Sequence, residues 1–292
     1  DGAWHRVAGT SSCLGLGASR ACPALRPTPE MPLSDAVQTD TGLVLPGPLV
    51  SVVRIDPALG RVSQPAGRDG CFTGLAVALC RRIAGLAGAV EIRQIVARGD
   101  LLAVRADDFT FDYRIVLLRR NAAGGYEQLG ACIGTVGTRC AYARGQVRDV
   151  SIALDGGRLW VMRTDSSAPG CDRTPCVQVD VYPVDDTTGL GPSEETCAGT
   201  TPGCVPLPAS QPRRLVQSPG DDEAYVVDGD ALVAIHDGPS GIAVGASAND
   251  PRGGSGPGGT VFHFSPISHP IHQGPSAYLI FGHAEMTLAR PV

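Results

Sequence analysis

The sequence predicts an all-β protein, and three observations support this fold class. Apolar and polar residues alternate in short segments, for example from Val150 to Leu154, and a period of two is typical of half-buried strands. The 292 residues include 38 glycines and 24 prolines without a collagen period, which indicates many turns between short strands. Helical periodicity is weak, because the one helix-like segment, Leu75 to Ala89, contains Gly85 and Gly88.

The segment from Arg148 to Ser193 shows the unit that recurs along the chain. Its pattern predicts two strands around a tight turn at Asp155 to Gly157, then a loop with two cysteines, then a third strand from Val177 to Val184. Trp160 falls in the core pattern of the second strand, so we expect it to be a packing residue. Similar strand–turn–strand segments have their turns at Asp40 to Gly42, Gly99 to Asp100, Gly220 to Asp222 and Gly282 to His283.

A repeat of ~60 residues with three or four strands is close in size to one blade of a β-propeller. One blade cannot bury both of its faces, so neighbouring blades must stack around an axis. We therefore predict a single β-propeller domain, or a fragment of one, over residues 1–292. Its repeats are expected at roughly 23–71, 72–132, 133–197, 198–250, and 251–292 together with 1–22. A pair of β-sandwiches is the alternative, since sandwiches also have strands at short spacing.

The two ends of the chain together would form one repeat that lacks only its outer strand. Two arrangements follow: a ring of about five repeats closed by both ends, or a piece of a larger propeller with about six to eight blades. The second is favoured, because an open strand edge promotes aggregation and propellers normally close it.

The ten cysteines fall into neighbouring pairs, and the first members of four pairs are 58, 61 and 65 residues apart. An even number of cysteines in local pairs predicts five short-range disulfides, each contributing roughly 2–3 kcal/mol through loop closure. Disulfides persist in oxidising compartments, so we expect an extracellular, periplasmic or cell-surface protein; reduced thiols in a cytosolic protein are the alternative. The predicted disulfides are Cys13–Cys22, Cys71–Cys80, Cys132–Cys140, Cys171–Cys176 and Cys197–Cys204.

The segment LDGGRLWV and the later VQVDVYPVDDTTGLG resemble the blade repeat of lactonase-like and YVTN-type propellers. The segment RIDPALGRV, from Arg54 to Val62, is similar to the end of the outer strand in those blades. The resemblance extends from Asp35 to about Gly245 and implies a propeller fold. By fold analogy it also implies a lactonase-like or glycan-acting hydrolase with a site at the central channel.

Three histidines, His263, His269 and His272, lie close together near the C-terminal end, followed by His283. Neutral imidazoles that converge from a loop bind zinc or copper, so these residues are candidate metal ligands. The alternative is that they are surface or turn residues, because no carboxylate or cysteine lies within the cluster to complete a site.

Acidic pairs occur at 107–108 and 185–186, and an acidic triplet at 221–223. Paired carboxylates bind calcium or act as general acids and bases. Asp also favours turn geometry, however, and this interpretation as solvated turn residues is preferred. We therefore predict no catalytic residue and no cofactor, with zinc, copper or calcium as the metals left open.

Other classes of function are disfavoured by the composition. The net charge of −5 argues against a nucleic-acid partner, and no apolar run is long enough to span a membrane. The sequence contains no lysine, which excludes Schiff-base chemistry, and no G-x-S-x-G nucleophile elbow.

The function predicted is a non-catalytic extracellular propeller, a binding or structural module that presents disulfide-pinned loops to a protein partner or a surface assembly. The block from Arg148 to Ser193 is the expected contact, since only it has an additional cysteine pair. A hydrolase and a subunit of a surface appendage are the alternatives, so enzymatic activity is left open.

Overall fold

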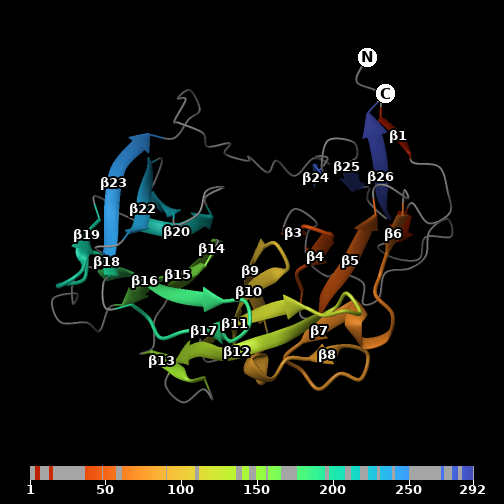
Figure 1. Ribbon diagram of the computed structural model, residues 1–292, viewed down its shortest axis with the longest axis horizontal. Helices are drawn as coiled ribbons and strands as arrows, with labels where there is room; N and C mark the ends of the chain where they lie inside the picture. The colour runs from red at the N-terminus through yellow and green to blue at the C-terminus, as the bar shows by residue number, and fades with distance from the viewer. Residues whose placement is uncertain are drawn as a thin grey trace. The chain divides into compact units, whose positions relative to one another are not determined.

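A computed structural model places the strands of the chain. The structure describes residues 4–6, 13–15, 37–47, 49–56, 61–89, 91–108, 112–135, 140–144, 149–155, 157–165, 176–194, 197–207, 212–217, 223–228, 231–238, 241–249, 271–272, 278–281 and 285–291. These residues form five β-sheets and two short 3-10 helices, η2 (Gly67–Gly70) and η3 (Ala84–Leu86), with no α-helix among them (Figure 1). The all-β prediction is confirmed.

The contacts divide the chain into two compact units, which are described separately. Unit 1 contains residues 1–87, 120–127 and 262–292, and unit 2 contains residues 88–119 and 128–261.

Two sheets lie in unit 1. One has the order β3 (Val37–Thr39), β4 (Gly42–Leu45), β5 (Val50–Asp56), β7 (Cys71–Thr73), β8 (Arg81–Arg82), with β6 (Arg61–Ser63) also paired to β5. The other has the order β1 (Trp4–Arg6), β26 (Glu285–Pro291), β25 (Tyr278–Phe281), β24 (Ile271–His272), with β2 (Cys13–Gly15) also paired to β26.

The second of these sheets contains both the first and the last strand of the chain. Antiparallel pairing puts Trp4 opposite Pro291 and Cys13 opposite Thr287. The sequence led us to expect that the ends share one repeat but leave its outer strand absent. The structure differs in the second point, because β24, β25 and β26 already form three successive strands, and β1 and β2 pair with β26 as β6 and β7 pair with β5 in the other sheet of unit 1.

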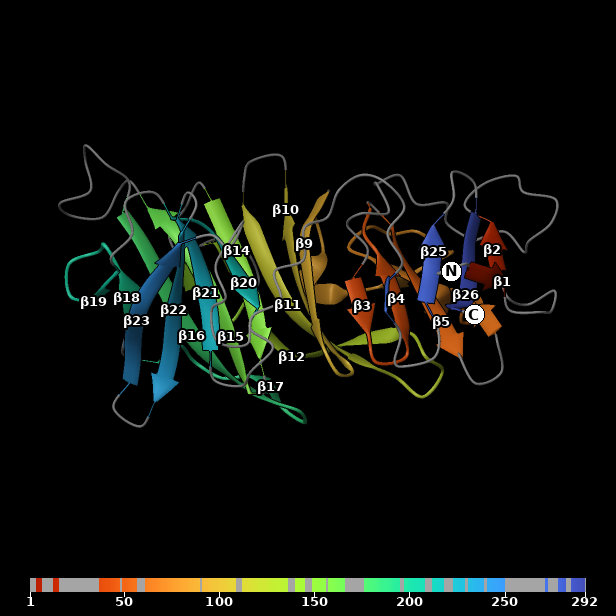
Figure 2. The ribbon, with the colours of Figure 1, turned by 90° about the horizontal axis from the view of Figure 1, so that it is seen from above.

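Unit 2 is built mainly from three sheets, which Figure 2 shows from above. The first has the order β13 (Tyr142–Arg144), β12 (Tyr126–Thr135), β11 (Tyr113–Arg120), β10 (Leu101–Asp107), β9 (Glu91–Arg98). The second has the order β14 (Asp149–Asp155), β15 (Arg158–Asp165), β16 (Cys176–Asp185), β18 (Cys197–Gly199), β19 (Val205–Pro206), with β17 (Gly189–Leu190) paired to β16. The third has the order β20 (Pro212–Gln217), β21 (Glu223–Asp228), β22 (Ala231–Gly238), β23 (Gly241–Asn249). The tip of the β11–β12 hairpin, residues 120–127, belongs to unit 1.

The sheets end later in the chain than the predicted repeats. Repeat boundaries were expected directly after Cys71, Cys132 and Cys197, but the sheets continue to Arg82, Arg144 and Pro206. The reason is local: the disulfide holds the segment after each second cysteine against the strand that carries the first cysteine. The predicted helix-like segment therefore contains β8 and only the short η3.

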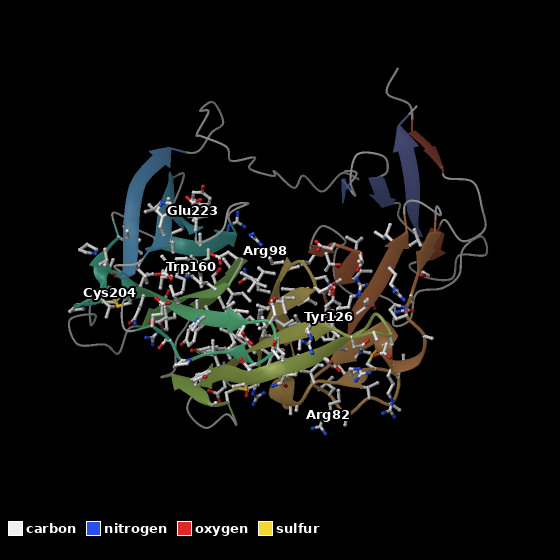
Figure 3. All side chains as sticks on the ribbon, viewed as in Figure 1. Arg82, Arg98, Tyr126, Trp160, Cys204 and Glu223 are labelled. Atoms are coloured by element: carbon white, nitrogen blue, oxygen red, sulfur yellow. A yellow bond between two sulfur atoms is a disulfide. The ribbon has the colours of Figure 1, made fainter. Side chains whose placement is uncertain are left out.

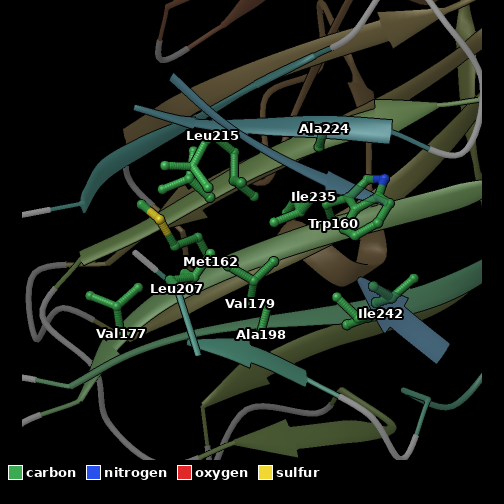
Figure 4. Close-up of a cluster of buried hydrophobic side chains, with 14 residues drawn as sticks. Trp160, Met162, Val177, Val179, Ala198, Leu207, Leu215, Ala224, Ile235 and Ile242 are labelled. Atoms are coloured by element: carbon green, nitrogen blue, oxygen red, sulfur yellow. The ribbon is translucent and has the colours of Figure 1, made fainter. Parts of the chain in front are cut away.

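The sheet that begins with β14 is buried on both faces. Val150, Ile152 and Leu154 pack against residues of β10, β11 and β12 in one cluster. Trp160 and its neighbours pack against residues of β20 to β23 in a second cluster (Figure 4). The interpretation of these strands as half-buried is therefore corrected. Apolar residues at both alternating positions lie in a core, as expected for a sheet that lies between two others.

Backbone groups at the free edge of β14 are satisfied by side chains of the adjacent sheets. The Gln94 amide donates to the Ile152 carbonyl (2.8 Å), and the Ile152 N–H donates to the Gln94 amide oxygen (2.9 Å). Arg105 donates to the Val150 carbonyl. In the reverse direction, the hydroxyl of Ser151 on β14 accepts from the Leu215 N–H of β20 (2.9 Å). Polar groups that would be left unpaired in a buried edge are thus paired.

Replacing Gln94 with alanine is expected to lower the free energy of unfolding by about 1–3 kcal/mol, because both backbone groups of Ile152 lose their partner. Gln128→Ala is the control, since the Gln128 amide donates at an exposed position to the Gly130 carbonyl, and it should change stability by less than about 0.5 kcal/mol. Urea titrations followed by circular dichroism measure both. Equal stability of the two variants would contradict the bridging role of Gln94.

Candidate functional site at the disulfide-closed sheet edges

Three of the five predicted disulfides lie in the described residues, and all three are confirmed. Cys71–Cys80, Cys132–Cys140 and Cys197–Cys204 join Cα atoms 4.9, 4.8 and 4.8 Å apart. Cys176 is disulfide-bonded as well. The pairing of Cys13 with Cys22, and of Cys176 with Cys171, falls outside the described residues.

Each of these three disulfides closes the outer edge of one sheet. The strand with the first cysteine is followed by a short strand that pairs with it in parallel, which puts Phe72 opposite Arg81, Ile133 opposite Tyr142, and Ala198 opposite Val205. Parallel neighbours ordinarily need a crossover of about a dozen residues or more. Here the disulfide loop makes the connection in fewer residues. The added strand covers an edge that would otherwise expose unpaired backbone groups.

The loop between Cys71 and Cys80 is held from both sides. A Cβ on Gly74 would lie 1.9 Å from the Leu86 carbonyl oxygen, so only glycine allows η3 to approach this closely. Arg68 Nε donates to the Ala78 carbonyl at 3.1 Å. The side chains that this frame leaves exposed are apolar, and Leu79 is 48% exposed.

The loop between Cys197 and Cys204 has a similar frame and a different surface. The Thr200 hydroxyl accepts from the Val177 N–H (2.8 Å), while the Thr200 N–H donates to the Val177 carbonyl (2.8 Å). Its exposed residues are Thr200, Pro202 and Gly203. The sheet edges thus share a closing device but present different chemistry.

Two of the acidic candidates, Asp107 and Asp108, have hydrogen-bond partners in the structure. Asp107 is buried and accepts from Arg105 Nε and an Arg105 terminal nitrogen at 3.2 and 2.8 Å, so its interpretation as a solvated turn residue is corrected. Asp108 accepts from the Asp112 N–H (3.1 Å). Residues 221 and 222 fall outside the described part of the chain.

Asp185 is an exposed turn residue, as predicted. Its Oδ1 accepts from the Thr188 N–H (2.6 Å), the Thr187 N–H (2.9 Å) and the Thr188 hydroxyl (2.9 Å). The hydrogen bond from the Thr188 N–H, followed by that from Thr187, holds the pKa of Asp185 below its usual value. This carboxylate organises the turn between β16 and β17.

Two of the three predicted metal ligands, His263 and His269, fall outside the described residues. His272 lies in β24, opposite Tyr278. Within the described ranges, no group of three or more His, Cys, Asp or Glu residues could hold a metal ion.

One charged cluster in unit 2 was missed by the sequence analysis. Asp237 on β22, whose side chain is 2% exposed, forms an ion pair with Arg158 at the start of β15. The carboxyl of Glu194, which follows β17, hydrogen-bonds to Asp237. Burial raises the pKa of Glu194, the negative charge of Asp237 raises it further, and Arg158 lowers it. No local pattern reveals such a cluster, because its three residues come from distant segments.

Glu194→Gln is expected to stabilise the protein at pH 7 by up to about 1 kcal/mol, a small value because Glu194 is only partly buried. The pKa of Glu194 is higher in the folded state, so the folded protein binds this proton more tightly than the unfolded chain does. The wild type therefore loses stability as the pH rises from 4.5, the ordinary pKa, through the raised pKa of the folded state. Glutamine keeps a donor for Asp237 without the charge, so the two proteins should be equally stable below that window.

Urea midpoints measured from acidic to neutral pH test this expectation, with Glu91→Gln as the control. Glu91 forms an ion pair with Arg93 (2.9 Å) that is about half exposed, so its replacement should leave the pH dependence unchanged. A Glu194→Gln variant that is less stable than the wild type at pH 7 would contradict repulsion between the two carboxylates.

Comparisons with known proteins identify no family for this chain. No protein-family model matches the sequence, and no curated protein matches it. Among solved structures, the crystal structure of the polysaccharide lyase Uly1 is similar with a TM-score of 0.37 and 12% identity over 86% of this chain. The chain spans 55% of the length of that protein. In the described part of the chain, no helix is long and apolar enough to cross a membrane.

Proposed function

We propose that this chain is a non-catalytic binding or structural module of an extracellular, periplasmic or cell-surface protein. Its disulfide-closed sheet edges contact a protein partner or a surface assembly. The proposal rests on one observation. Three sheet edges are closed in the same way, by a disulfide and a short parallel strand, while the loops at Cys71–Cys80 and Cys197–Cys204 expose different residues. A constant frame with variable tips is typical of loops that bind partners from a rigid scaffold.

Two further features support the proposal. The disulfides favour an oxidising compartment. Support for a propeller comes from the three sheets of unit 2, of which the middle one is buried on both faces by its neighbours. Face-to-face stacking of four-stranded or larger sheets is the way in which propeller blades bury their apolar residues.

Site-specific photo-crosslinking tests the function. A photoreactive amino acid replaces Ala76 or Pro202 in the disulfide loops, and replaces Asp40 or Asp100 as controls at exposed hairpin turns. The protein is made by its own host, irradiated and examined for covalent adducts. The proposal expects an adduct of defined mass from at least one loop position and none from the turns. Adducts from the turns alone, no adduct from either loop, or turnover of lactone or polysaccharide substrates would overturn it.

A further inference from the structure

The loop from Gly74 to Leu79 differs from other described surfaces in the apolar side chains that it exposes. Among the side chains that the structure describes, Leu79 is the one large hydrophobic side chain that is exposed. Ala76 and Ala78 are exposed beside it. Apolar side chains gathered at one place on a surface indicate an interaction site.

The conformation of the loop is fixed at both ends, so these apolar side chains stay exposed. Its ends are joined by the Cys71–Cys80 disulfide, and the Leu75 N–H donates to the Thr73 hydroxyl (3.1 Å). After the loop, the Ile83 N–H donates to the Thr73 carbonyl (2.8 Å). A loop that is fixed before binding loses less conformational entropy on association.

Arginines precede and follow this apolar tip in the chain. Arg68 is exposed and reaches the loop through the Ala78 carbonyl, and Arg82 follows the loop and points away from the sheet (Figure 3). The charge of Arg81 is neutralised by Asp69, whose Oδ1 lies 2.7 Å from a terminal guanidinium nitrogen of Arg81. The same oxygen accepts a hydrogen bond from the Asn121 amide nitrogen at 2.9 Å. The hydrogen bond from Asn121 and, after the opposing effect of burial, the Arg81 guanidinium keep the pKa of Asp69 low, so this ion pair stays charged.

We infer that the Cys71–Cys80 loop docks a protein segment that has an apolar residue to pack against Leu79 and carboxylates for Arg68 and Arg82. This inference rests on the proposed function and names the chemistry of the partner. Charge complementarity identifies the occupant, because two exposed arginines flank the apolar tip although the whole chain carries a net charge of −5. Arginine is also enriched in protein interfaces.

An anionic membrane is the occupant that fits less well. Stable attachment to a lipid surface needs a wide apolar face or two anchoring signals. One exposed leucine with two alanines is a small apolar surface, enough to contact an apolar residue of a protein segment but too small to anchor the chain to a bilayer.

Selection from a phage-displayed library of random peptides, about twelve residues long, tests the inference with the whole protein as bait. Peptides with Asp or Glu on both sides of an apolar residue should be enriched. Leu79→Asp should weaken the binding of a synthetic peptide of this kind at least tenfold, and Arg82→Glu at least fivefold. Arg214→Glu, an exposed arginine on β20, is the matched control and should leave the affinity unchanged. Raising the salt concentration should weaken wild-type binding.

Peptides without an acidic bias, or equal binding to the Leu79→Asp variant, would overturn the inference. Binding to vesicles that contain phosphatidylserine, lost on Leu79→Asp, would overturn it in favour of a membrane. Intact Cys71–Cys80 in each variant, checked by a non-reducing peptide map, excludes misfolding as the cause. If crosslinks form from position 202 and not from position 76, the inference fails while the proposed function stands.

Discussion

Replacing Trp160 with alanine is expected to lower the free energy of unfolding by about 3–5 kcal/mol. The side chain is fully buried between the sheets of unit 2, where it packs in the cluster shown in Figure 4. Its Nε1 also donates to Asp155 Oδ2 at 2.6 Å. The substitution therefore leaves a cavity and a buried carboxylate without this donor. Urea unfolding followed by circular dichroism, with all disulfides intact, measures the loss.

Trp160→Phe separates the two contributions. Phenylalanine keeps most of the ring packing and lacks the donor, so a loss of about 1–3 kcal/mol is expected. Leu79→Ala serves as a surface control and should change stability by about 0.5 kcal/mol or less. A Trp160→Ala variant that is no less stable than Leu79→Ala would show that the two sheets do not pack as described.

Removing the Cys71–Cys80 disulfide with the double substitution Cys71→Ala and Cys80→Ala is expected to cost about 2–3 kcal/mol. The effect is large because β7 and β8 share only two opposed residue pairs, which do not hold without the covalent link. The Ile83 N–H, which donates to Thr73, should therefore exchange faster in hydrogen–deuterium exchange.

The matched control removes the Cys197–Cys204 disulfide in the same way. There Thr200 ties the loop to Val177 through both its hydroxyl and its N–H, so local order should largely survive. Faster exchange around Cys204 than around Ile83 would contradict this difference between the loops.

Hairpins with local signals could be predicted from the sequence. The turn at Gly99 and Asp100 joins β9 to β10, and Gly99 has a φ of 57°, a conformation that favours glycine. The expected strand from Val177 to Val184 is β16, Cys176–Asp185. Turn residues and alternation are encoded within a few positions, so one sequence suffices to find them.

Features that depend on other sheets could not be predicted. Ser151 looked like an outward polar residue, yet it is buried, and its hydroxyl accepts from the Leu215 N–H of β20. The strands β8, β13 and β19 have two or three residues, too few for any periodicity, and each follows the second cysteine of a disulfide. The exposed Leu79 gave no signal either, since an apolar segment such as GLAVAL is more often buried.

Hydrogen–deuterium exchange of the protein, alone and bound to the partner isolated by crosslinking, tests most directly whether the disulfide-closed edges form the binding surface. The prediction is that amides of residues 74–79, of residues 200–203, or of both become protected on binding, while the β3–β4 and β9–β10 turns do not change. Protection confined to those turns or to the free edge of β14, with both loops unaffected, would contradict it.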